Sequence, residues 1–385
     1  MVLLKYLFRN ILRHKLRSFL TVLSVSIAVL SYCLLNTIIN AWYAGVSASS
    51  SYRLIVRNAI SLVFSLPISY RERIKQVKGV TNVAYGNWFG GIYIEEKNFF
   101  ANFAVEPETF LKLYPEFIIS DAEKKEFLKD RKGCIVGRKL TERFGWKVGD
   151  RVVLRGTIFS GNWEFVIKGV YKGKDRTVDE SQFLFHWEYL NETLKKTNPR
   201  RADQVGYFIV GISNPEDAAE VSKEIDGLFK NSIAETLTET EKAFQLSFVT
   251  MTEAIVIAIK VVSYVVIAII IVVVANTMAM SVRERKSEYA TMKAFGFDSF
   301  IISFIIISES VLISLIGSVI GVILTFPAVK IVGDILSVYF PIFVLREVVI
   351  YKSLSYSILA GFLSGLLPSI EVIRVGIADG LRWSG

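Results

Sequence analysis

NTMAMSVRERKSEYATMKAFGFDSFIISFIIISE, the stretch Asn276–Glu309, decides how the rest of the chain is interpreted. It leaves one apolar segment, passes through a basic run, stops at Gly296 and enters a second apolar segment. At helical spacing, one face of the run carries Tyr289, Met292 and Phe295, and other faces carry Arg283, Arg285 and Lys286. This pattern predicts a short helix at a membrane surface with apolar side chains available to a partner. By periodicity alone, a plain interfacial loop is the simpler interpretation.

The segments on either side of this stretch belong to a larger set of apolar runs. Of the 385 residues, 52% are hydrophobic and the mean hydropathy is +0.43, whereas a soluble domain is roughly 45–50% apolar. Runs of about 20 residues with few or no charges are long enough to cross a bilayer. We expect transmembrane helices at 18–40, 256–282, 299–329 and 351–370. An extracytoplasmic loop at 330–350 then joins the last two helices.

The distribution of charge indicates the orientation of these spans. Residues 1–17 contain five basic side chains and no acid, whereas residues 41–249 are nearly balanced, with 30 basic and 27 acidic ones. Basic residues favour the cytoplasmic side, so we expect both termini in the cytoplasm, including the tail 371–385. The net charge of +9 is therefore a topology signal, and we expect no nucleic-acid partner. The first span is too long for a cleavable signal peptide, which is the rival interpretation.

Two features near the membrane leave alternatives open. Residues 1–17 have apolar and basic faces, which is typical of a cytoplasmic amphipathic helix in the headgroup region, although the flank of a membrane helix would look similar. Apolar residues also repeat at helical spacing over 231–255, at Ile233, Leu237, Phe244, Phe248 and Ile255. We expect the second membrane helix to continue outward as a stalk there, beside an extension of the first through 41–50. A separate short helix is the alternative.

The insert 41–249 has the pattern of a mixed α/β domain. Strands at Tyr52–Val56, Thr81–Tyr85 and Phe99–Val105, with a helix at Ser69–Val77, suggest a split β-α-β unit. A second subdomain is predicted to begin near Gly133. A strand at Gln204–Gly211 and a helix at Pro215–Phe229 are then expected to rejoin the first subdomain.

Small residues and one acid stand out within the last two spans. Small residues four apart allow close helix packing, and two such pairs occur: Gly317 and Gly321, then Gly361 and Gly365. Glu309 is the one acid of the third span, and a carboxylate in hydrocarbon is costly. We expect a structural hydrogen bond from Ser or Tyr on a neighbouring helix rather than a proton relay, because a relay needs several ionisable groups.

Motifs for catalysis are absent from the sequence. There is no G-x-x-x-x-G-K-[ST] run for ATP phosphates, and no G-x-S-x-G, HExxH, CxxC or GxGxxG. The two cysteines and two histidines do not form a metal-ligand cluster at zinc spacing. We therefore expect a non-catalytic subunit that binds no cofactor or metal itself.

The motif N-T-M-x-M-S-V-R-E-R-x-x-E-x-x-x-x-K-A-x-G resembles the signature of MacB/FtsX-type permeases, the mechanotransmission ABC transporter superfamily that includes the LolC and LolE lipoprotein-release subunits. The similarity extends to RNILRHKLRSFLTVLSVSIAV at 9–29, IVGRKLTERFGWKVGDRV at 135–152 and GLLPSIEVIRVGIADGLR at 365–382. It covers essentially the whole chain. One departure is Glu371, which stands among residues that are often more basic in relatives.

The resemblance implies a cell inner-membrane subunit with four transmembrane helices and a large extracytoplasmic (periplasmic) α/β domain between helices 1 and 2. That domain would have a porter-like part and a smaller β-rich subdomain. Segment 283–298 corresponds to the coupling helix, with Arg283, Glu284, Arg285, Glu288, Tyr289, Met292, Lys293, Phe295 and Gly296 contacting the ATPase. The implied partners are an ABC ATPase dimer that uses ATP and Mg, a second permease copy (a homodimer) or a paralogue, and membrane lipid. A periplasmic adaptor and an outer-membrane protein are further partners that it allows.

Two functions from different classes follow from this resemblance. The first is export or membrane extraction of a client, which would be a peptide, lipid, lipoprotein or toxic small molecule. The alternative is an FtsX-like signalling subunit that activates a cell-wall hydrolase. An insert of about 200 residues favours the exporter, because FtsX-type extracellular domains are small. A passive receptor anchored by four helices would leave the coupling-type loop unexplained.

Overall fold

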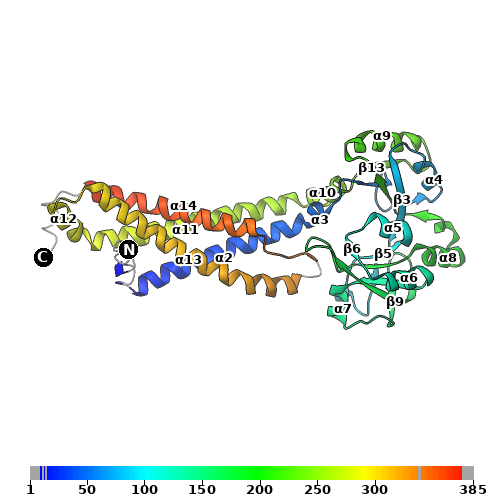
Figure 1. The fold of residues 1–385 in the computed structure, drawn as a ribbon, viewed down its shortest axis with the longest axis horizontal. Coiled ribbons are helices and arrows are strands. Elements are labelled where there is room, and N and C mark those ends of the chain that lie inside the picture. Colours follow the sequence, from blue (N-terminus) through cyan, green and yellow to red (C-terminus); the bar gives the residue numbers. More distant parts are fainter. Residues whose placement is uncertain (1–8, 11–12, 14, 337–339, 375–385) are drawn as a thin grey trace. The chain divides into compact units, whose positions relative to one another are not determined.

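The computed structural model describes residues 9–10, 13, 15–336 and 340–374, which fall into two compact units (Figure 1). The helical unit comprises residues 1–41, 252–335 and 343–385, and the α/β unit comprises residues 42–251 and 336–342. Of the N-terminal helix expected at 1–17, residues 1–8, 11–12 and 14 lie outside the described residues. Residues 375–385 of the expected tail also lie outside them.

Within the described residues, four helices are long and apolar enough to cross a membrane. They are α2 (Lys15–Trp42), α11 (Glu253–Glu284), α13 (Ser299–Leu336) and α14 (Glu347–Arg374). Each is longer than its expected span, because helical hydrogen bonding continues past the uncharged core into polar residues at the ends. The loop expected at 330–350 is correspondingly shorter, since α13 reaches Leu336 and α14 begins at Glu347.

A short helix, α12 (Lys286–Ala294), separates α11 from α13. It is shorter than the expected 283–298, because α11 continues through Glu284 before the break. Gly296 ends it with φ of +88°, a left-handed conformation that glycine adopts without strain. The N–H groups of Gly296 and Phe297 bond the carbonyls of Lys293 and Met292 at 3.0 and 3.1 Å. This is the Schellman arrangement that satisfies the last carbonyls of a helix.

The glycine pairs lie where the membrane helices approach most closely. A Cβ added to Gly321 would lie 2.6 Å from the Ser26 carbonyl of α2, and one on Gly365 would lie 2.9 Å from the Ile307 Cα of α13. Serine hydroxyls cross the same contacts, from Ser26 to the Gly317 carbonyl at 2.9 Å and from Ser310 to the Gly361 carbonyl at 2.6 Å. Both seams therefore combine close backbone contact with interhelical hydrogen bonds.

The α/β unit is built on one hydrogen-bonded sheet of eleven strands, in the order β13-β1-β12-β3-β5-β10-β7-β9-β8-β4, with β6 paired to β9. The strands are β1 (Arg53–Asn58), β3 (Val80–Trp88), β4 (Gly91–Ile92), β5 (Asn102–Val105), β6 (Phe117–Ile118), β7 (Gly133–Gly137), β8 (Arg151–Gly156), β9 (Gly161–Gly173), β10 (Phe183–His186), β12 (Tyr207–Ile212) and β13 (Thr236–Thr240). A separate pair joins β2 (Leu66–Pro67) to β11 (Gln204–Val205).

Helices flank this sheet (Figure 1). They are α3 (Ala44–Ala48), α4 (Tyr70–Ile74), α5 (Pro107–Leu113), α6 (Asp121–Lys129), α7 (Arg138–Phe144), α8 (Trp187–Thr197), α9 (Ala218–Leu228) and α10 (Glu241–Met251). The largest buried cluster of the unit is rich in aromatic side chains, including Phe89, Phe165, Phe183 and Phe185. The Phe89 ring lies edge-on to Phe185, with centroids 5.1 Å apart, a favourable geometry for aromatic pairs.

The sheet does not break near Gly133, where a second subdomain was expected to begin. Strand β10 pairs parallel with β5 and antiparallel with β7, so it joins the two expected parts. The sequence did not predict β10, because all four of its residues are buried and a strand without alternation gives no period-two signal. The α/β unit is therefore continuous in its strand pairing.

The expected stalk helix over 231–255 is wrong in its first half. Residues 236–240 form β13, which pairs antiparallel with β1. Threonine favours strands, and the hydroxyls of Thr236 and Thr238 both bond Asp226 Oδ1, at 2.8 and 2.6 Å. A separate helix, α10, follows and ends at Met251. It packs beside α3, where a Cβ on Gly45 would lie 2.8 Å from the Gln245 side chain.

The seam between α13 and α2 generates a prediction. Gly321→Ala should destabilise the helical unit by about 1–3 kcal/mol, because the new methyl group must displace a backbone carbonyl. Thermal unfolding can be followed with a thiol-reactive dye in a Cys134→Ser background, since the remaining Cys33 is fully buried in this unit. Val319→Ile adds a similar volume at a half-exposed site of the same helix and should leave the midpoint unchanged. Equal midpoints for both variants would refute the close contact.

Candidate functional site

One end of the helical bundle lies around α12 (Figure 1), and charged side chains from α2, α11, α12 and α13 meet there. Arg17 of α2 pairs with Glu284 of α11, with Nη1 and Oε2 2.7 Å apart. Lys293 of α12 donates to the carbonyls of Val372 and Ile373 in α14, at 2.7 and 3.1 Å. We call this region the charged end; its members are Arg13, Arg17, Glu284, Arg285, Glu288, Lys293 and Glu309.

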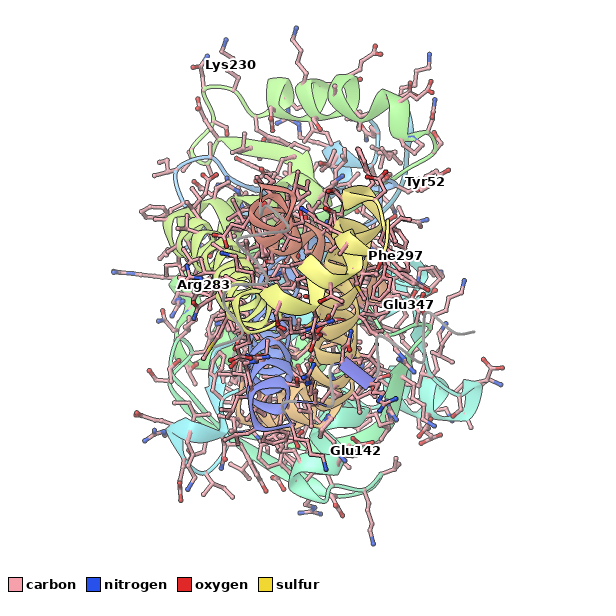
Figure 2. All side chains as sticks on the ribbon, turned by 90° about the vertical axis from the view of Figure 1, so that its left-hand side faces the viewer. Tyr52, Glu142, Lys230, Arg283, Phe297 and Glu347 are labelled. Atoms are coloured by element: carbon pink, nitrogen blue, oxygen red, sulfur yellow. The ribbon has the colours of Figure 1, made fainter. Side chains whose placement is uncertain are left out.

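The residues expected to contact an ATPase divide into three groups by exposure. Figure 2 looks onto this end of the bundle and labels Arg283 and Phe297 there. The exposed group is Arg283, Glu284, Phe295 and Gly296, and the half-buried group is Glu288, Met292 and Lys293. Arg285 and Tyr289 are buried, with 4% and 2% of their surface exposed. A partner that approaches this end therefore meets Phe295, of which 80% is exposed, and cannot reach Tyr289.

This arrangement corrects the expected apolar face of the loop. Tyr289, Met292 and Phe295 do not face one way: Tyr289 and Met292 pack into the core of the bundle, whereas Phe295 points to solvent. Helix geometry places Phe295 about 120° around the axis from Tyr289, and the Arg285 guanidinium lies 5.0 Å from the centroid of the Tyr289 ring. Such cation–π contacts favour a buried tyrosine beside a buried arginine.

The expected partner of Glu309 is also wrong. Its carboxylate pairs with Arg285 rather than with Ser or Tyr, with Oε2 and Nη1 2.9 Å apart and both side chains 4% exposed. The sequence signal for this pair is the position of Arg285 directly after the apolar run of α11. Because α12 is short, a cation at this position can reach α13.

Glu288 links α12 to the N-terminal end of the chain. It accepts hydrogen bonds from Arg13 and from Arg285 Nε, the latter at 3.2 Å. Partial burial raises the pKa of Glu288, but these two hydrogen bonds outweigh it and hold the pKa below the usual glutamate range. The basic N-terminal segment, which the sequence marked only as an orientation signal, thus also forms ion pairs with α11 and α12.

This site contains no arrangement for bond chemistry. Six of its members form ion pairs, and Lys293 donates to backbone carbonyls. These residues include no nucleophile beside a base. In the described part of the chain, no group of three or more His, Cys, Asp or Glu is placed to hold a metal ion.

Two known domains cover most of this architecture. Residues 18–228 match the MacB-like periplasmic core domain, and residues 260–377 match the FtsX-like permease C-terminal domain. The chain belongs to the FtsX/MacB-type ABC transporter permeases. The second match contains α12 and the charged residues of α11, α13 and α14.

Relatives of this permease are found in archaea and bacteria. It is 25% identical to the ABC transporter permease MJ1507 of Methanocaldococcus jannaschii, over 99% of this chain and 97% of that protein. It is 34% identical to the ABC transporter permease YvrN of Bacillus subtilis over 111 residues, which are 29% of this chain and 26% of that protein.

Two solved domains of other proteins also match part of this permease. The extracellular domain of the noncanonic ABC-type transporter YknZ from Gram-positive bacteria matches with a TM-score of 0.35 and 14% identity, covering 49% of this chain and 100% of that domain. A domain of a permease protein from Porphyromonas gingivalis matches with a TM-score of 0.32 and 17% identity, covering 49% of this chain and 88% of that domain.

A second buried ion network lies inside the α/β unit of the permease. Arg53, at the start of β1, donates from Nε to Glu241 Oε2 at 2.8 Å and from Nη2 to Glu116 Oε1 at 2.7 Å. Its Nη1 donates to the Leu113 carbonyl at 2.8 Å, and the guanidinium lies 4.0 Å from the centroid of the Tyr114 ring. Burial lowers the pKa of Arg53, but Glu241 and Glu116 more than offset this and raise it overall.

Glu241 is the acceptor that completes this network. It receives the Ser50 N–H at 2.8 Å and the Tyr114 hydroxyl at 2.9 Å, in addition to Arg53. Burial, together with the nearby Glu241 charge, raises the pKa of Tyr114 well above its usual value, so its hydroxyl stays a donor. Ser50 directly precedes β1 and Glu241 opens α10. The network therefore ties the segment that follows α2 in the chain to the segment that leads into α11.

The first prediction from these networks concerns Arg53. Arg53→Met should destabilise the α/β unit by about 3–5 kcal/mol, because it leaves the buried Glu241 and the half-buried Glu116 without their positive partner. Tryptophan fluorescence during thermal unfolding reports this unit, since Trp146, Trp163 and Trp187 are buried in it. Arg151→Met is the matched control, because Arg151 is exposed and its pair with Glu164 is at the surface. A loss in the control as large as that in Arg53→Met would argue against a special role for the network.

The second prediction concerns pH and Glu288. Its lowered folded pKa means that ionised Glu288 stabilises the permease above the usual glutamate pKa of about 4.3, and that this stabilisation is lost as the pH falls further. The stability difference between the permease and Glu288→Gln should therefore be largest at neutral pH and should shrink in acid. It can be measured as the fraction of monodisperse protein that survives heating at each pH. Glu347→Gln controls for the loss of one exposed charge, and a difference independent of pH would contradict the assignment.

Proposed function

We propose that this permease is the transmembrane subunit of an ABC transporter that couples ATP hydrolysis by a separate ATPase subunit to movement of its α/β unit. The movement would drive export or membrane extraction of a client, which would be a peptide, a lipid, a lipoprotein or a toxic small molecule. The observation that carries the proposal is α12, a short helix held by ion pairs at one end of an apolar bundle, which exposes Phe295 beside it.

The exposed surface around α12 has the composition of a docking site. Phe295 and Phe297 are 80% and 49% exposed, and the basic Arg283 and the acidic Glu284 are exposed at the same end of the bundle. Exposed aromatic residues with a polar surround are typical of the centres of protein interfaces. Such a surface supports α12 as the coupling helix, with Phe295 and the turn at Gly296 as the main contact to the ATPase.

The path from this surface to the α/β unit runs along the chain. Helix α11 extends from Glu253 to Glu284, so that one end adjoins α12 and the other directly follows α10 of the α/β unit. A continuous helix transmits axial displacement because its backbone hydrogen bonds resist compression. Coupling is therefore supported by α11, a continuous helix that lies in the chain between the docking surface and α10, the helix that carries Glu241.

The orientation follows from the charged end. Basic side chains gather there, at Arg9, Arg13, Lys15, Arg17, Arg283, Arg285, Lys286 and Lys293, and basic residues favour the cytoplasmic side. We place this end and both termini in the cytoplasm of a multi-pass inner-membrane protein. The α/β unit would then be periplasmic, with the porter-like part in the strands around β1, β12 and β3 and the smaller β-rich part around β7, β8 and β9.

The remaining partners follow from the same proposal. Two permease copies, or this permease and a paralogue, would pair with two ATPase subunits, and ATP and Mg would be bound by those subunits. The permease itself would bind no cofactor. A periplasmic adaptor and an outer-membrane protein would complete the route in a cell with two membranes. Signalling to a cell-wall hydrolase is less well supported, because an α/β unit that spans residues 42–251 is larger than such a role requires.

The coupling surface generates a prediction. Phe295→Asp should abolish co-purification of the ATPase subunit that is expressed together with the permease, because it places a charge at the centre of an apolar contact. The variant should still fold, since Phe295 is exposed. Phe64→Asp is the matched control: Phe64 is 53% exposed but lies in the α/β unit, and this variant should retain the ATPase.

The measurement is the ratio of ATPase to permease after affinity purification in detergent, with thermal unfolding to verify folding. An unchanged ratio for Phe295→Asp would count against α12 as the docking helix. Tyr289→Asp cannot replace this test, because Tyr289 is buried and its substitution should disrupt the bundle.

A further inference from the structure

We infer that Arg285 and Glu309 are positioning residues that fasten α12 to α13, so that a displacement of the coupling helix moves the third membrane helix with it. This inference rests on the proposed function and adds to it the joint through which the docking surface acts. It concerns two side chains that lie away from the exposed surface around Phe295.

The pair is built as a rigid joint rather than a surface contact. Arg285 Nη1 lies 2.9 Å from Glu309 Oε2, and both side chains are 4% exposed. The same guanidinium reaches Glu288 Oε2 at 3.2 Å with its Nε, and it lies over the ring of Tyr289. Three contacts from one planar group fix its orientation, which a flexible surface pair does not achieve.

The position of the pair in the fold determines what it connects. Arg285 is the residue between α11 and α12, and Glu309 lies within α13, beyond its first turns. If α12 moves alone, Arg285 is pulled away from Glu309. A buried carboxylate without its positive partner in an apolar environment costs free energy. The two helices are therefore expected to move together.

The segment of α13 that carries Glu309 is in turn held by α14. The neighbouring Ser310 donates to the Gly361 carbonyl at 2.6 Å. A Cβ on Gly365 would lie 2.9 Å from the Ile307 Cα, and one on Gly361 would lie 2.8 Å from the Val311 Cα. Close contact on both sides of Glu309 leaves little room for α13 to deform locally. A displacement received at Glu309 is passed to α14 and along α13.

The test measures the order of α12 in the full permease, in lipid nanodiscs and without ATPase. Amide hydrogen exchange over 286–296 should rise about tenfold or more in Glu309→Gln, because the joint is lost and local opening becomes easier. Glu309→Asp retains both charges and should stay nearer the wild-type rate. Glu347→Gln, an exposed acid at the start of α14, is the matched control and should exchange like the wild type.

A second measurement separates positioning from general stability. With the ATPase co-purified, Glu309→Gln should keep the ATPase, since the surface around Phe295 is unchanged. It should, however, lose the change in exchange of α13 that ATP produces in the wild type. If Glu309→Gln fails to fold, Glu309→Asp takes its place: its shorter side chain weakens the bond to Arg285, so exchange over 286–296 should rise above the wild-type rate.

Two results would overturn the inference. One is wild-type exchange of 286–296 in Glu309→Gln. The other is a Glu309→Gln variant that keeps the ATP-dependent change in the exchange of α13. Failure of the proposed function would look different, because Phe295→Asp would then retain the ATPase whatever the exchange of α12 in the permease alone.

Discussion

A carboxylate in an apolar helix must find a positive partner, and at Glu309 this requirement fixes the end of the bundle. Its partner Arg285 is close by, because only the nine-residue helix α12 and a short turn separate Arg285 from the start of α13. Arg285 is therefore held against α13, and Tyr289 is buried with it because the guanidinium lies over the Tyr289 ring. Phe295 directly follows α12, just before the turn at Gly296, and its side chain is left outside. One electrostatic constraint thus decides which face of α12 is buried and which is available to a partner.

The rest of the helical unit is held by a different kind of contact. In lipid, apolar side chains gain little from facing each other rather than the bilayer, so close backbone approach and hydrogen bonds must supply the energy of association. Gly317 and Gly321 provide the approach to α2, and Gly361 and Gly365 provide the approach to α13. Hydrogen bonds from Ser26 and Ser310 cross these two helix contacts and make the packing directional. Contacts of this kind resist sliding, which suits helices that must move as a group.

Much of this architecture could be predicted from the sequence, and the failures have physical causes. Runs of uncharged residues predict membrane helices because the bilayer imposes a length, and the glycine pairs pointed to the places of closest approach. The partner of Glu309 and the burial of Tyr289 were missed because periodicity places residues on a face but does not say what the face meets. Strand β10 was missed because full burial removes alternation. The predicted stalk helix is wrong at β13, because Thr236 and Thr238 bond Asp226 and the strand pairs with β1.

The two buried ion networks have the same design in different units. Arg285 joins the end of α11 to the interior of α13, and Arg53 joins the start of β1 to the start of α10. In each case an arginine at an element boundary bonds two carboxylates and lies over a tyrosine ring. An arginine fork binds two acceptors in a fixed geometry, which a lysine cannot do. Helices α10 and α11 are consecutive in the chain. This segment therefore begins at one buried ion network, through Glu241, and is followed directly by the other, through Arg285.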